Sequence, residues 1–267
     1  MSYKPLEPAL IDLAQASGWQ HRDDLPFGKV LFDDPANDRI VKLGSDPVAQ
    51  GLIRAEAAGL ERLGPLLKPI LRVAEGRLLH DDDDGVALAM SRLDGETASK
   101  WSTASYSITA ALAPSQSTAH LSELVAQEPC DEASRDLLLK RFGDPLVPVS
   151  PSHGDNIYWN VLLGGDRPGL IDFEYAGPRR VAGYDDLHHR LAPWLTRICR
   201  SPWLPDRCLI PIGRAFARTL VRDHHLELPP RLLLALFFLH WAGLRRSLNL
   251  APESFPYERI ERLATIA

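Results

Sequence analysis

The spacing of apolar residues divides the chain into an N-terminal part that predicts strands and a longer part that predicts helices. Short apolar runs bounded by turn formers predict strands, and apolar positions that recur every three or four residues predict helices. The expected helices of the first part are Leu10–Ser17 and 50–67. The expected strands are 29–32, 39–43, 70–73, 77–80 and 86–90, with one more beginning near Trp19.

Beyond residue 118 the pattern is mainly helical. Leucines 137–139 are expected to pack inward, and the run 232–241 is apolar on most faces and is expected to be buried. Segment 97–117 is weakly patterned and predicts helices whose ends cannot be placed, and Gly177-Pro178 is expected to turn the chain. The expected helices are 119–127, 133–141, 187–199, 205–225, 230–248 and 256–265.

Two polar motifs flank a predicted hairpin. His153-Gly154-Asp155 is followed by Asn160, which gives the form His-x-Asp-x-x-x-x-Asn. A short apolar strand follows Asn160, and a second one, 169–171, ends in Asp172-Phe173-Glu174. Between them, 164–168 is rich in turn formers, so the sequence predicts two short antiparallel strands with carboxylates at both ends.

Phosphoryl transfer requires these types of residue. A carboxylate must orient the attacking hydroxyl and accept its proton, while an amide oxygen and a second carboxylate must hold Mg²⁺ beside the phosphates. Asp155 fits the first role, and Asn160 and Asp172 fit the other two. Protein kinases present the three groups in the same order.

The combined motif resembles the aminoglycoside phosphotransferase and choline kinase family. Gly154 follows the histidine where protein kinases have Arg, and Asp172 is followed by Phe-Glu instead of Phe-Gly. The resemblance implies an α+β, protein-kinase-like fold with two lobes. Residues 1–93 would form a nucleotide-binding lobe with a mainly antiparallel sheet and one helix, and 94–267 a mainly helical catalytic and substrate lobe. It also implies ATP and Mg²⁺ as cofactors and a small-molecule hydroxyl as the acceptor.

The same family resemblance assigns a lysine and a glutamate in the first part of the chain. Lys42 lies between the apolar residues Val41 and Leu43 on a predicted strand, so its side chain points to the opposite face from theirs. Glu56 lies in the helical run 50–67, and a strand–helix Lys–Glu ion pair positions the phosphates in protein kinases. We therefore expect Lys42 to pair with Glu56.

Two further positions follow from the resemblance. Residues 90–93 correspond to the hinge where adenine hydrogen-bonds backbone groups, so Met90 and Leu93 are the expected nucleotide contacts. Asp186 matches an Asp beyond the metal site, and it is expected to hold the catalytic loop or to cap a helix.

The sequence departs from kinases where a glycine-rich loop would cover the phosphates. Only Pro26-Phe27-Gly28-Lys29 stands there, although amides of a short turn could meet phosphate oxygens and Lys29 could add charge. A catalytically inactive nucleotide-binding or interaction protein is therefore an alternative, and the intact Asp155, Asn160 and Asp172 argue against it. A protein kinase is a third hypothesis, which the lack of a recognisable activation segment disfavours.

Composition indicates where the protein works and with what partners. The 267 residues are 45% hydrophobic and 24% charged, as in ordinary soluble proteins. No apolar run suggests a membrane span or a signal peptide, so no membrane partner is expected. The three cysteines lack metal-type spacing and favour a reduced, cytoplasmic compartment. The net charge of -5 gives no indication of nucleic-acid binding, and the oligomeric state is left open.

Charge is unevenly distributed along the chain. Residues 179–250 carry 12 Arg, no Lys and 5 Asp or Glu, a net of +7. A polycationic acceptor bound there would need carboxylates to partner its ammonium groups. A neutral or anionic hydroxyl compound is therefore the expected acceptor, and the alternative is that these arginines are a solvated surface of amphipathic helices.

Overall fold

The computed structural model describes residues 5–99, 108–128, 132–200, 206–247 and 257–267. The chain forms two compact units. The first comprises Met1–Ala98 and Asn160–Ala176, and the second comprises Ser99–Trp159 and Gly177–Ala267. The hairpin that carries Asp172 thus belongs to the N-terminal unit, whereas the simple boundary at residue 93 stays a prediction about functional lobes.

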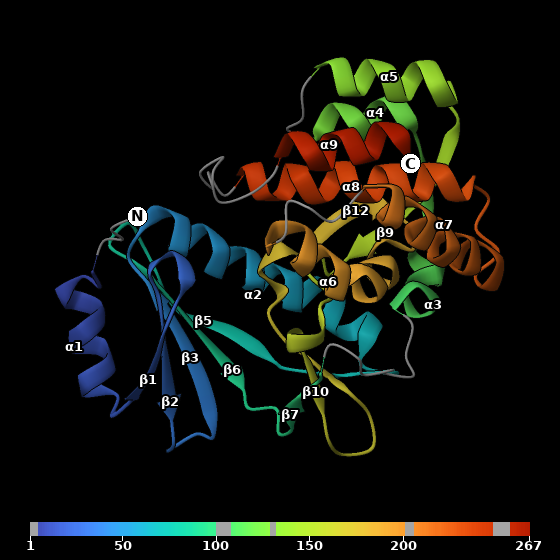
Figure 1. Cartoon of the computed structure of the whole chain (residues 1–267). Coiled ribbons are helices and arrows are strands. Elements are labelled where there is room, and N and C mark those ends of the chain that lie inside the picture. Colours follow the sequence, from blue (N-terminus) through green and yellow to red (C-terminus); the bar gives the residue numbers. More distant parts are fainter. Residues whose placement is uncertain (1–4, 100–107, 129–131, 201–205, 248–256) are drawn as a thin grey trace. The chain divides into compact units, whose positions relative to one another are not determined.

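The first unit is built on an antiparallel five-stranded sheet in the order β1-β2-β3-β6-β5 (Figure 1). Each strand was expected from the sequence. Their bounds are β1 Gln20–Leu25, β2 Lys29–Asp34, β3 Arg39–Gly44, β5 Gly76–Asp81 and β6 Val86–Ser91.

Two helices cover opposite faces of this sheet. Helix α1 (Pro8–Ala16) packs Leu10 and Ala14 against Val41 and Leu43 of β3. Helix α2 (Pro47–Leu67) packs on the other face, because the alternation of β3 sends Lys42 toward it. The predicted orientation of Lys42, opposite to its apolar neighbours, is therefore present.

A second, smaller sheet in this unit contains the predicted hairpin. Its order is β4-β11-β10-β7, with β10 antiparallel to both β11 and β7, and β4 parallel to β11. The 3₁₀ turn η4 (Phe173–Tyr175) follows β11 and lies against α2. The strands are β4 Arg72–Val73, β7 Glu96–Thr97, β10 Val161–Leu163 and β11 Gly169–Leu170.

The second unit combines a three-stranded antiparallel sheet, ordered β12-β9-β8, with helices. Helix α8 (Pro230–Ser247) supplies much of its core, since every residue from Leu232 to Leu239 is buried, as predicted. No described helix has the length and apolar character needed to cross a lipid bilayer. The other elements are β8 Ser117–His120, β9 Leu146–Ser152, β12 Gly177–Val181, α3 Ile108–Leu112, α4 Leu121–Gln127, α5 Glu132–Phe142, α6 Tyr184–Arg200, α7 Asp206–Asp223 and α9 Tyr257–Ile266.

Three expectations for the second unit were wrong. The sheet was not foreseen: Gly177-Pro178 begins strand β12 rather than a turn, and the first residues of the expected helix 119–127 belong to β8. Leu138 is buried but Leu137 is exposed, because only one side of α5 faces the core. By contrast, the weakly patterned segment 97–117 was expected to contain helices, and 108–112 form α3, while residues 100–107 lie outside the described structure.

The close approach of α2 to η4 generates a first prediction. A Cβ added at Gly59 would lie 2.7 Å from the Phe173 carbonyl oxygen, so Gly59→Ala must displace the turn that carries Asp172 and Glu174. We expect it to lower the free energy of unfolding by roughly 1–3 kcal/mol, the usual effect of overpacking. The measurement is urea unfolding followed by circular dichroism.

Gly51 provides the matched control in the same helix. It is exposed and has nothing within 4 Å of an added Cβ, so Gly51→Ala should stabilise the protein by about 0.5–1 kcal/mol. If both substitutions changed stability equally, the contact between Gly59 and η4 would not control the position of the turn.

Candidate active site

The predicted Lys42–Glu56 ion pair is present in the first unit. Lys42 Nζ lies 2.8 and 2.6 Å from the two carboxylate oxygens of Glu56, and both side chains are buried. The local fold brings Lys42 and Glu56 together. Asp46 caps the start of α2, and a Cβ added at Gly44 would lie 2.6 Å from the Cβ of Ala49, so only a glycine lets β3 and α2 come so close.

Asp172 joins the same lysine from the hairpin. Its Oδ1 lies 2.9 Å from Lys42 Nζ, and its backbone is left-handed (φ 69°, ψ 63°), which is uncommon for a residue other than glycine. Such backbone conformations concentrate at functional sites. The amide of Ile171 donates to the Asn160 carbonyl oxygen at 3.0 Å, which fixes buried Asn160 beside the strand that leads to Asp172.

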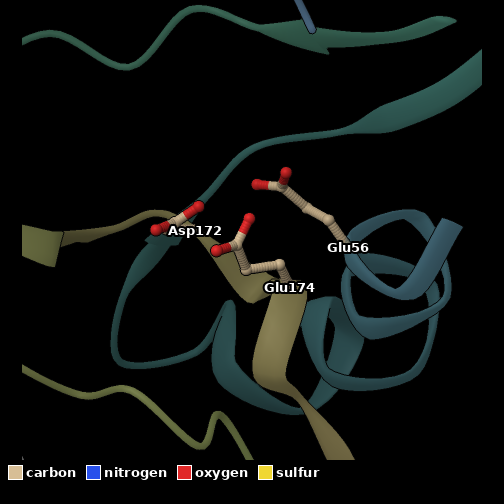
Figure 2. Close-up of side chains that lie close together, drawn as sticks. All are labelled: Glu56, Asp172 and Glu174. Atoms are coloured by element: carbon tan, nitrogen blue, oxygen red, sulfur yellow. The ribbon is translucent and has the colours of Figure 1, made fainter. Parts of the chain in front are cut away.

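A third carboxylate, Glu174, completes a cluster that sequence reasoning missed. Figure 2 shows Glu56 projecting from α2 and Glu174 from η4, with Asp172 beside them. One carboxylate oxygen from each of the three lies within 4.8 Å of the others. The signal was visible in the Asp-Phe-Glu motif, where Glu stands in place of the glycine of protein kinases.

The donor set of this cluster fits Mg²⁺. Carboxylate and amide oxygens are the hard ligands that Mg²⁺ prefers. Glu56 already holds Lys42 through both oxygens, so Asp172 and Glu174 are the carboxylates of the cluster best able to reach a metal, with Asn160 directly before the adjoining strand β10.

A second buried ion pair lies in the same unit. Lys29, the first residue of β2, pairs with Glu174, and each side chain is only 4% exposed. The sequence marked Lys29 as a cation near the phosphates but did not predict its partner, because the two residues are 145 positions apart.

The electrostatics of the site keep Lys42 charged. Burial acts to lower the pKa of Lys42, but the carboxylates of Glu56 and Asp172 outweigh it and raise the pKa above its ordinary value. Burial acts in turn to raise the pKa of Glu56, and the Lys42 ammonium opposes that shift. Lys42 is therefore a permanent cation at physiological pH.

The predicted hinge residues also belong to the first unit. Met90 is a buried residue of β6, whose backbone pairs with Ile40 of β3 and Gly76 of β5. Leu93 is half-buried just after that strand. Their contact with adenine stays a prediction.

Asp155 lies in the second unit, on a buried loop held by Asp185. The Asp185 carboxylate accepts from the backbone amides of His153 and Gly154, both at 2.9 Å, and from Ser152 Oγ at 3.2 Å. Asp185 lies in the first turn of α6, so the helix start and the loop are fixed together. His188, one helical turn further on, places Nε2 3.9 Å from Asp155 Oδ1.

The sequence assigned loop-holding and helix-capping as alternative roles of Asp186, and the structure divides them between neighbours. Asp185 holds the loop, which was not predicted. Asp186 accepts from the amides of Ile108 and Thr109 at 2.9 and 3.4 Å and so caps α3, as one alternative foresaw.

A further polar group surrounds Tyr184 in the second unit. The Tyr184 hydroxyl donates to the Gly154 carbonyl oxygen at 3.4 Å, and its ring contacts His240 edge-on at 4.8 Å between centroids. His240 pairs with Glu128, and Arg180 lies over the Tyr184 ring. These residues carry polar and charged groups to the loop that holds Asp155, and sequence reasoning did not single them out.

Comparisons with known proteins identify the fold. No protein-family model and no curated protein matches the sequence. Among solved structures, a thermostable mutant of aminoglycoside phosphotransferase APH(4)-Ia with AMP-PNP and hygromycin B is similar (15% identity, 97% of this chain, 98% of that chain, TM-score 0.58). A candidate fructosamine-3-kinase from Thermobifida fusca is equally similar (17% identity, 97% and 99% coverage, TM-score 0.58).

A third solved structure is more distant. It is the aminoglycoside phosphotransferase APH(3'')-Id from Streptomyces rimosus (16% identity, 88% and 97% coverage, TM-score 0.50). The chain therefore has the α+β, protein-kinase-like fold of these proteins, and the predicted fold class is confirmed.

The burial of Asp185 generates a pH prediction. Burial raises the pKa of its carboxyl from 3.8 to about 6, although the amides of Gly154 and His153 act to lower it. Between these values the folded protein holds a proton that the unfolded chain has released. The stability from this group is therefore fully present below pH 3.8 and is lost as the pH rises through about 6.

Asp185→Asn removes this titration and isolates its effect. Relative to that variant, wild type should gain unfolding free energy on the order of 3 kcal/mol between about pH 7.5 and about pH 3.5, from the free energy of each pKa unit. Urea unfolding at both pH values measures the difference, with the exposed Asp223→Asn as a control. A difference independent of pH would contradict the raised pKa.

Proposed function

We propose that this protein is a Mg²⁺-dependent phosphotransferase that moves the γ-phosphate of ATP to a hydroxyl of a small molecule, as members of the aminoglycoside phosphotransferase and choline kinase family do. The observation that carries the proposal is Lys42, buried and shared between Glu56 and Asp172 in a protein-kinase-like fold. A permanent cation fixed between two carboxylates suits the positioning of nucleotide phosphates.

The residues take separate roles in this mechanism. Lys42, held by Glu56, contacts the phosphates, and the backbone near Met90 and Leu93 binds adenine. Asp172 and Asn160, with Glu174, hold Mg²⁺, which supplies positive charge against the phosphate oxygens when bound. Asp155 orients the acceptor hydroxyl and takes its proton.

The phosphoryl transfer needs no reactant other than ATP and the acceptor. The acceptor oxygen forms a bond to the γ-phosphorus, and the bond from that phosphorus to the β–γ bridging oxygen breaks. ADP leaves with the bridging oxygen, and the hydroxyl proton passes to Asp155. Asp185 supports this step indirectly, because it holds the amides of His153 and Gly154 and thereby fixes the Asp155 loop.

The acceptor itself stays a prediction. Several arginines of 179–250 already have partners: Arg214 donates to the carbonyls of Ile266 and Ala267, Arg222 pairs with Asp223, and Arg246 pairs with Glu261. Arg180 approaches the loop that holds Asp155, with Nη1 3.1 Å from Ser152 Oγ. We therefore favour a neutral or anionic hydroxyl compound on the basis of Arg180 rather than the total charge. The cytoplasm is the compartment proposed for this activity.

Asp155→Asn tests the proposed reaction. It keeps the size of the side chain and removes the base, so turnover should fall at least about 100-fold, as for other general-base groups. AMP-PNP binding should remain within a few-fold of wild type, because Asp155 contacts the acceptor. The measurement is ADP release over a panel of neutral sugars, nucleosides, hydroxy acids and aminoglycosides.

Asp223→Asn is the matched control, since Asp223 is exposed on the same unit and pairs with Arg222 on the surface. Wild type that binds AMP-PNP but phosphorylates no panel member, and shows no ATP hydrolysis, would favour the inactive nucleotide-binding alternative. A peptide as the sole acceptor would favour a protein kinase.

A further inference from the structure

The Lys29–Glu174 pair includes a residue of the segment 26–29, which stands in the sequence where kinases have a glycine-rich loop. Lys29 directly follows the turn 26–28, in which Phe27 and Gly28 have positive φ angles of 66° and 76°. Positive φ at Phe27 is uncommon for a bulky side chain and marks a strained turn. The turn is therefore followed directly by the buried, positively charged side chain of Lys29.

The balance of charge around this pair limits what can bind. Lys29 and Lys42 stand against Glu56, Asp172 and Glu174, two positive charges against three negative ones. A largely buried cluster with a net negative charge repels a nucleotide polyphosphate. Either the lysines must change partners or positive charge must arrive with the nucleotide.

The two lysines differ in how firmly they are held. Lys42 contacts both oxygens of Glu56 and one of Asp172. Lys29 has a single carboxylate partner among the described residues, Glu174, and that partner lies in the group whose oxygens suit a metal. Lys29 is therefore the cation that can be exchanged.

We propose that Lys29 is a second phosphate-binding cation, which Glu174 holds until Mg²⁺ and nucleotide enter together. Lys29 then passes from the Glu174 carboxylate to a phosphate oxygen, and Glu174 becomes available to the metal. The inference rests on the proposed function and deepens it, because it gives the chain a replacement for the missing glycine-rich loop and links nucleotide binding to Mg²⁺.

If Lys29 changes partners in this way, substitutions of Lys29 and of Glu174 should have opposite effects on the affinity for AMP-PNP. Lys29→Met should weaken AMP-PNP binding in Mg²⁺ at least about 10-fold, the effect of losing a charge-assisted contact, while adenosine binding stays within about 2-fold. Glu174→Gln should strengthen AMP-PNP binding without metal at least about 3-fold, because Lys29 is released. It should also reduce the gain that Mg²⁺ gives in wild type.

A double variant separates release of Lys29 from the simple loss of a negative charge. Lys29→Met with Glu174→Gln should lose the metal-free gain that Glu174→Gln shows alone. It also avoids leaving Glu174 buried and unpaired, so it keeps the test valid if Lys29→Met alone does not fold. Lys68→Met is the matched control, since Lys68 is an exposed lysine of the same unit.

Isothermal titration calorimetry with adenosine and AMP-PNP, in Mg²⁺ and in EDTA, measures all of these affinities. Melting temperatures report folding. The inference is overturned if wild type binds AMP-PNP and a folded Lys29→Met or double variant binds it equally well in Mg²⁺, or if the double variant keeps the metal-free gain. Wild type that binds neither adenosine nor AMP-PNP would instead overturn the proposed function.

Discussion

The buried ammonium group of Lys42 links three parts of the first unit: the sheet, helix α2 and the β10–β11 hairpin. It comes from the sheet, and its partners come from α2 and from the end of the hairpin. Removing one partner of a buried ion pair leaves an uncompensated charge, which is strongly destabilising. The strand, the helix and the hairpin are therefore held together, because moving any one of them away would break an ion pair of Lys42.

Close backbone packing is the condition for this arrangement. Gly44 lets β3 approach the start of α2, and Gly59 lets η4 approach its middle. The left-handed backbone of Asp172 then turns its carboxylate back toward Lys42. The two glycines and the left-handed Asp172 make the close backbone approach possible, and Lys42 supplies the charge that the carboxylates surround. The site needs both kinds of residue.

The sequence predicted the parts of the fold and site that depend on local pattern. Alternation in β3 predicted the face of Lys42, and helical spacing predicted α2. The resemblance to kinases then predicted that Lys42 pairs with Glu56, and the pair is present. The hairpin was evident from its turn residues and short apolar strands. For the strand, the helix and the hairpin, the information lies within a few residues along the chain.

The features it missed depend on contacts distant in sequence or on prolines in unexpected places. Pro148 and Pro151 lie in β9 and Pro178 in β12, and proline argues against a central strand, so the sheet of the second unit was hidden. The Lys29–Glu174 pair joins residues 145 positions apart. Of the two adjacent aspartates at the start of α6, only packing decides that Asp185 holds the loop.

Both units place charged groups where burial opposes their charge. In the second unit, Asp185 is buried deeply enough to raise its pKa to about 6, although it must be ionised to accept fully from the amides of the Asp155 loop. In the first, five charged side chains gather with an excess of negative charge. A chain under selection for stability alone would replace such groups with apolar ones, which is often neutral or stabilising. Binding a charged ligand would require charged groups at the cluster of Glu56, Asp172 and Glu174, and moving a proton would require them at the Asp155 loop.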